Sequence, residues 1–245
     1  ISREDASILL IQLSRNERFT LEGSVTYFHD ENEVNATLNN ILETFGDNLR
    51  GEAAYISMRQ FADSGMLYAV NTILDNTHPS VLDDIHASDA GDVLSFVVNQ
   101  RDYRDESGEF VETELNDVIA TTVNILETFG DNISLDRMDY SISIFMQRGE
   151  LSGVNAILDN MHPSLANDLR DSDVAHILER VVDDTNPYNG QRYYNETDEL
   201  VATVTNIMTT FGDNIDPHGI SSALNTFADR GQLDEAIAHC LHILT

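Results

Sequence analysis

The chain repeats itself, and this internal repeat limits its fold more than any other feature of the sequence. The segment ILETFGDN at 41–48 returns unchanged at 125–132, and the variant IMTTFGDN stands at 207–214. Between 38–88 and 122–172, 24 of 51 positions are identical. We therefore expect two full units, residues 5–88 and 89–172, followed by a third, shorter unit at residues 173–245.

Each unit contains a stripe of apolar residues at helical spacing. In the first unit the stripe consists of Val34, Leu38, Ile41, Leu42 and Phe45. Steps of four, three, one and three residues place these side chains on one face of an α-helix. Gly46, Gly130 and Gly212 follow the last stripe residue of each copy. They predict helix ends with positive φ, and we expect Phe45, Phe129 and Phe211 to be buried beside them.

A second pattern predicts two helices joined by a tight turn. In the third unit it reads FADRGQLDEAIAHCL and places Phe227, Gly231, Leu233 and Ala236 at matching positions. This stretch resembles the centre of a tetratricopeptide repeat, which implies αα-hairpins. The family's period of about 34 residues and its usual Trp and Pro are missing, so we interpret the resemblance as similar hairpin packing and not as membership. With about five helices per unit, the sequence predicts an all-α tandem helical repeat of about 84 residues.

The segment 102–113 and its counterpart 184–195 predict the one long loop of a unit, with a short strand or an extended arm. The 102–114 stretch is rich in Asp and Glu but does not fit the spacing of an EF-hand. A solvated acidic loop is the favoured interpretation, and a weak divalent-cation site is the alternative. Each GDN triplet supplies one carboxylate, too few for calcium, so we interpret the triplets as helix caps and turns.

The histidines are the other candidate ligands. His78 and His162 each precede Pro-Ser, where a histidine would cap a helix entry or, alternatively, act as a ligand or pH switch. His239, Cys240 and His242 lie close together on the last expected helix. A metal site is the alternative there, but His239 occupies a position that is apolar in the other units, which favours a buried histidine. We assign no metal site to these residues.

The sequence contains none of the motifs that mark a catalytic or nucleotide-binding centre, such as GxSxG, GxGxxG, HExxH or a P-loop. An active site is normally built once, whereas the notable features of this chain recur. We therefore expect no enzyme activity, no catalytic residue and no cofactor. The favoured function is an acidic helical module that binds a protein partner. The alternative is a repetitive structural protein of a cell surface or extracellular matrix, which would associate with itself.

The chain is strongly acidic, with 43 Asp and Glu against 13 basic residues and a net charge of −30. Such a surface repels phosphate groups, so nucleic acids are excluded as partners. No apolar run approaches the length of a membrane span, so we expect no membrane insertion.

Every basic residue is arginine, and lysine is absent. Adaptation to high salt, escape from ubiquitin attachment and avoidance of amine cross-linking are three explanations that the sequence leaves open. The sequons at Asn35, Asn132 and Asn195 are compatible with secretion. A secreted or cell-surface location is therefore favoured over a cytoplasmic one, without being fixed.

The charge imbalance predicts that salt stabilises the fold. Raising NaCl from about 0.1 to about 1 M shortens the Debye length from about 10 to about 3 Å, which screens the repulsion between carboxylates. We expect the melting temperature, followed by circular dichroism, to rise over this range. Mild acidification should act in the same direction at first, because crowding by like charges raises a carboxyl pKa in the folded state. A flat or falling melting temperature would mean that specific partners hold the carboxylates.

Overall fold

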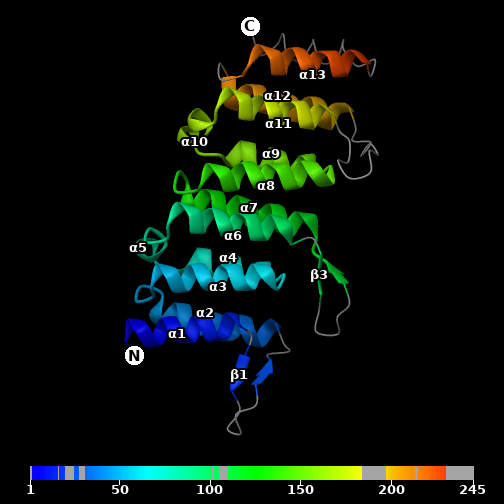
Figure 1. Ribbon diagram of the computed structural model, residues 1–245. Coiled ribbons are helices and arrows are strands. Elements are labelled where there is room, and N and C mark those ends of the chain that lie inside the picture. Colours follow the sequence, from blue (N-terminus) through cyan, green and yellow to red (C-terminus); the bar gives the residue numbers. More distant parts are fainter. Residues whose placement is uncertain are drawn as a thin grey trace. The chain divides into compact units, whose positions relative to one another are not determined.

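A computed structural model gives the fold of most of the chain. It describes residues 2–15, 17–19, 25–27, 31–100, 102–104, 110–183, 197–212 and 215–229. These residues form thirteen α-helices and four short strands (Figure 1). The prediction of an all-α protein is confirmed at the level of fold class, with two small hairpins beside the helices. Contacts divide the chain into two units, residues 1–137 and 138–245, which are described separately.

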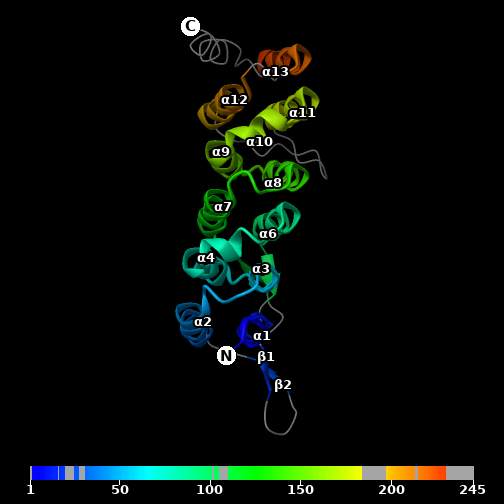
Figure 2. The ribbon, with the colours of Figure 1, turned by 90° about the vertical axis from the view of Figure 1, so that its left-hand side faces the viewer.

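The first unit is built from paired helices in layers. Its helices are α1 (Arg3–Ser14), α2 (Glu31–Phe45), α3 (Gly51–Asp63), α4 (Leu67–Asn76), α5 (Pro79–Leu82), α6 (Ala87–Asn99) and α7 (Leu115–Phe129). Helix α1 packs against α2 and α3, α3 packs against α4 and α6, and α4 packs against α2 and α7. Within this unit α1, α3 and α6 thus form one column, and α2, α4 and α7 form the other (Figure 2).

The second unit continues the same kind of packing. Its helices are α9 (Leu151–Asn160), α10 (Pro163–Asp168), α11 (Asp171–Asp183), α12 (Thr197–Phe211) and α13 (Pro217–Asp229), and α8 (Leu135–Arg148) begins in the first unit. Helix α12 packs against α9, α10 and α11, and α11 packs against α13. None of the described helices is both long and apolar enough to cross a membrane.

The predicted apolar stripes form the core between the helices. Val34, Leu38 and Leu42 of α2 are buried, as expected for one face of an amphipathic helix. Phe129 and Phe211 are also buried at the ends of α7 and α12. The prediction for Phe45 is wrong in degree, because this side chain is only half-buried at the end of α2.

The glycines that end these helices do not all act in the same way. Gly130 and Gly212 have φ of 55° and 51°, as predicted. The prediction of positive φ is wrong for Gly46, which is not among the described glycines with positive φ. A Cβ at Gly46 would lie only 2.9 Å from the carbonyl oxygen of Asn76, so this glycine is required by the close approach of α2 to the end of α4.

The turn between paired helices follows the pattern expected from the sequence. Gly65, between α3 and α4, and Gly149, between α8 and α9, both have φ of 71°. The backbone N–H of Met66 donates to the carbonyl of Phe61 at 2.9 Å, which is the long bond of a Schellman motif. This bond reverses the chain within two residues, so each pair of helices lies close together.

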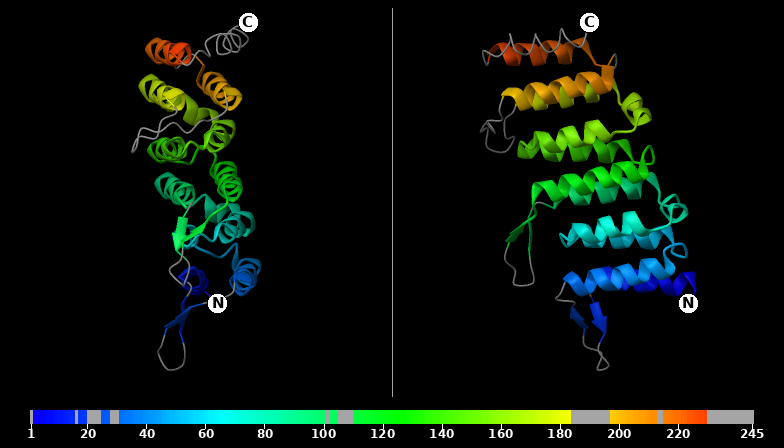
Figure 3. Two further views of the ribbon diagram at one scale, coloured as in Figure 1. Left: turned by 90° about the vertical axis from the view of Figure 1, so that its right-hand side faces the viewer. Right: turned by 180° about the vertical axis from the view of Figure 1, so that it is seen from behind.

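Two antiparallel hairpins leave the first unit on one side of its helices (Figure 3). Strand β1 (Glu17–Phe19) pairs with β2 (Val25–Tyr27), and β3 (Asp102–Arg104) pairs with β4 (Phe110–Glu112). The expected strand within 102–113 is therefore confirmed. Its counterpart at 184–195 lies outside the described residues.

Replacing Phe129 with Ala should lower the free energy of unfolding by about 3–5 kcal/mol, because it removes a buried ring and leaves a cavity. Phe45→Ala is the matched comparison and should have a smaller effect, since this ring is half-buried. Urea unfolding followed by circular dichroism would measure both variants. A loss below about 1 kcal/mol for Phe129→Ala would contradict the burial of the stripe.

Candidate functional site

A groove of about 430 Å³ lies where the C-terminal ends of α2 and α4 meet in the first unit. Its lining consists of Leu42, Glu43, Thr44, Gly46, Asp47, Asp75, Asn76, Thr77 and His78. Glu43, Asp47 and Asp75 are exposed and bring three carboxylates to this lining. The groove is therefore a concave, acidic surface.

The backbone around Gly46 shapes the groove. The N–H of His78 donates to the carbonyl of Gly46 at 3.3 Å, joining the end of α2 to the chain that follows α4. Thr77 is buried, and its hydroxyl has no hydrogen-bond partner within the described part of the protein. This hydroxyl is buried beneath the exposed carboxylates of the lining.

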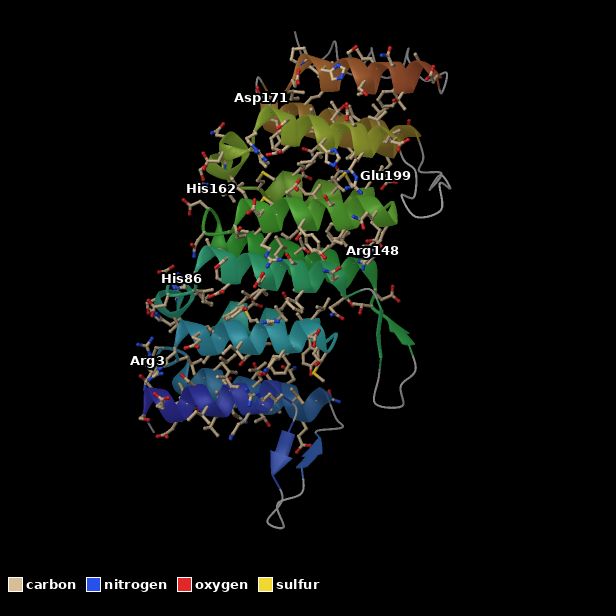
Figure 4. All side chains as sticks on the ribbon, in the orientation of Figure 1. Arg3, His86, Arg148, His162, Asp171 and Glu199 are labelled. Carbon is tan, nitrogen blue, oxygen red and sulfur yellow. The ribbon has the colours of Figure 1, made fainter. Side chains whose placement is uncertain are left out.

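His78 and His162 cap the short helices α5 and α10, so the capping interpretation is confirmed. His78 Nδ1 accepts a hydrogen bond from the Ser80 N–H at 3.3 Å, and His162 Nδ1 accepts one from the Ser164 N–H at 3.4 Å. The serine hydroxyls lie 2.9 and 2.8 Å from the same nitrogens. His162 stands at the start of α10 (Figure 4). In both places the ring supplies the acceptor that the first turn of a helix requires.

A cluster of polar side chains joins α4 to α7, and the sequence analysis did not anticipate it. Asn71 Nδ2 donates to Thr121 Oγ1 at 2.9 Å. Asn124 Nδ2 donates to Asn71 Oδ1 and to Asp75 Oδ1, each at 3.0 Å. Thr121 is fully buried and donates its own proton to the carbonyl of Asp117 at 2.9 Å. We call this set of residues, Asn71, Asp75, Thr121 and Asn124, an asparagine clasp.

A second clasp joins α9 to α12 in the other unit. Asn155 Nδ2 donates to Thr203 Oγ1 at 2.9 Å, and Asn206 Nδ2 donates to Asn155 Oδ1 at 3.2 Å. Asn206 also donates to Asp159 Oδ1 at 2.7 Å. All four residues lie 84 or 82 positions after their counterparts in the first clasp. The signal was present in the sequence as Asn and Asp four residues apart in both copies of the segment Val-Asn-x-Ile-Leu-Asp.

Two acidic residues near helix starts have pKa values below the ordinary range. Hydrogen bonds from Nε and Nη2 of the Arg170 guanidinium, at 2.8 and 3.0 Å, lower the pKa of the Asp173 carboxyl. Hydrogen bonds from the Ser2 side chain and backbone lower that of Asp5. A lowered folded pKa gives stability that is lost as the pH falls. These two groups therefore oppose the stabilisation by acid that the overall charge predicts.

The remaining candidates from the sequence lie apart from the groove. Asn132 Nδ2 donates to the carbonyl of Ile85 at 2.8 Å, and its backbone N–H donates to the carbonyl of Phe129 at 2.8 Å. This GDN triplet therefore forms a turn, and the amide of this sequon has a structural bond. Asn195, His239, Cys240 and His242 lie outside the described residues. Within the described part of the chain, no group of three or more His, Cys, Asp or Glu residues could hold a metal ion.

Replacing Asn124 with Ala should lower the free energy of unfolding by about 0.5–1.5 kcal/mol, because half-buried Asn71 loses a hydrogen bond and exposed Asp75 loses another. Asn40→Ala is the matched control, since Asn40 occupies the same position on α2 and is exposed. The control should change stability by less than about 0.5 kcal/mol. Urea denaturation measures the difference, and equal effects of the two variants would refute the structural role of the clasp.

Comparisons with known proteins give no independent guide to these features. No protein-family model, no curated protein and no solved structure matches the chain. The groove, the histidine caps and the two clasps must therefore be interpreted from their own geometry.

Proposed function

We propose that the chain is a non-enzymatic, acidic α-helical repeat protein that binds a protein partner as a scaffold module. Its proposed architecture is a tandem repeat of about 84 residues, with units at 5–88, 89–172 and 173–245. Each unit would contain about five helices and tetratricopeptide-like hairpins. The matching bounds of α4 and α9 and the recurrence of the asparagine clasp support this architecture. Stacked helical hairpins offer extended surfaces, which is the common use of such proteins.

The acidic groove between α2 and α4 is the observation that carries the proposal. Glu43, Asp47 and Asp75 line a concavity of about 430 Å³ in a chain whose net charge is −30. Complementary charge steers association and selects partners, so the partner should present arginine or lysine side chains. The same field excludes partners with exposed phosphate groups.

A repetitive structural protein of a cell surface or extracellular matrix is the second candidate. The clasps favour it, because they tie one helical layer to the next through side-chain hydrogen bonds in both units. A stack held in this way would serve as a stiff spacer or as part of a self-associating array. Enzyme activity, cofactors and resident metal ions have no part in either proposal, although weak binding of divalent cations to the acidic surface is compatible with both.

An arginine-rich peptide would test the scaffold proposal. Fluorescence anisotropy with a labelled nine-residue arginine peptide should show saturable binding that weakens as NaCl rises. Glu43→Gln with Asp47→Asn should weaken binding about fivefold to tenfold, since two partly exposed ion pairs contribute up to about 1 kcal/mol each.

The control removes the same charge elsewhere on the first unit. Glu52→Gln with Asp63→Asn neutralises two exposed carboxylates on α3 and should change the affinity less than twofold. Equal losses in the two double variants would show that the peptide follows net charge alone, and the groove would then have no role as a binding site.

A further inference from the structure

One face of α1 carries an exposed apolar residue at a position where the corresponding residues of α6 and α11 are buried. Leu9 is 40% exposed, whereas Val93 and Ile177, 84 and 168 residues later, are fully buried. On α6, Phe96 lies one turn after Val93 and receives the Arg59 guanidinium of α3 at 4.7 Å from the ring centroid. The face that contains Val93 therefore packs against the preceding helical pair, and Leu9 lies on the same face of α1.

Helix α2, which packs beside α1, carries the threonine and asparagine of an asparagine clasp without the Asn–Asp pair that completes it. Thr37 and Asn40 occupy the positions of Thr121 and Asn124 in α7. Thr121 is fully buried beneath Asn71 of the preceding pair, while Thr37 is half-buried and Asn40 is exposed. The layer formed by α1 and α2 thus presents an apolar side chain and a polar pair. Elsewhere in the chain the corresponding side chains pack against a preceding helical pair.

We propose that this face, defined by Leu9, Thr37 and Asn40, binds a helical hairpin of the α3–α4 kind. The second helix of the hairpin carries Asn and Asp four residues apart, as α4 and α9 do. The same contact is formed between α4 and α7 and again between α9 and α12, so the proposed hairpin would continue an existing interface. This hairpin and this face differ from the arginine- or lysine-bearing partner and the groove that are proposed above.

The polar pair selects against other occupants. A purely apolar surface would bury Thr37 and Asn40 without hydrogen-bond partners, which is unfavourable. A second copy of this chain is also a poor fit, since its Asn71–Asp75 and Asn155–Asp159 pairs are already engaged. At the corresponding positions of the third unit the sequence has Ile237 and Leu241, which cannot complete a clasp.

An extended chain tests this proposal with the whole protein present. A copy of residues 49–84 is fused ahead of Ile1, so that the added segment meets residue 1 as Asp84 meets Ile85. Hydrogen exchange of the α1 and α2 amides should slow by about tenfold or more in the extended chain. The same extension with Asn71→Ala and Asp75→Ala in the added copy is the control, and it should lose most of this protection. Unchanged exchange in the extended chain would overturn the proposal.

Two single variants separate docking from a folding failure of the added segment. Asn40→Ala and the uncharged change Leu9→Gln should lower the denaturation midpoint of the original chain only slightly, since Asn40 is exposed and Leu9 is 40% exposed. In the extended chain each should lower the midpoint further, and equal effects in both backgrounds would refute the interface.

Light scattering of the unextended chain tests whether a second copy of the chain occupies this face instead. A monomeric mass over a wide concentration range is expected. A mass that doubles with concentration and reverts with Leu9→Gln would assign the face to a second copy and overturn the hairpin. None of these measurements involves peptide binding, so they stand or fall independently of the groove.

Discussion

Burying a polar side chain between two helices is costly unless it finds hydrogen-bond partners there, and the register between stacked helices of this protein depends on that cost. Apolar stripes alone would let one helical pair slide along the next, because hydrophobic burial is not directional. Asn71 and Asn155 each meet a buried threonine and a second asparagine at one register only. The two clasps therefore fix the position of α4 against α7 and of α9 against α12.

Arginine is the basic residue that forms ion pairs with the carboxylates of this chain, because the sequence contains no lysine. Arg137 Nε lies 2.8 Å from Asp92 Oδ1 and joins the start of α8 to α6, while Arg170 holds Asp173 through two nitrogens. A planar guanidinium forms such paired bonds where an ammonium group cannot. Arg137 thus acts between layers and Arg170 at a helix start, while carboxylates such as Glu43 and Asp47 are exposed.

Features set by local sequence could be predicted, and features set by neighbouring layers could not. The stripes, the turn glycines and the histidine caps depend on residues within a few positions of one another. Gly46 looked like Gly130 in its local sequence, but its conformation is set by the end of α4. The clasp was missed for the same reason, since Asn71 and Thr121 are 50 positions apart and neither is unusual within its own helix. The lining of the groove likewise requires knowledge of which helix ends meet.

The layered contacts also determine how the first unit would respond to mechanical load. Among the described helices of this unit, α3 and α4 have packed neighbours on both sides, whereas the pair formed by α1 and α2 packs against one other pair, α3 and α4. In a stack where stability is shared between adjacent layers, a layer held on one side is the weakest. As long as no hairpin covers the face of Leu9, Thr37 and Asn40, a pulling force applied along the first unit would therefore detach α1 and α2 first. The first unit would then lengthen in discrete steps, one helical pair at a time.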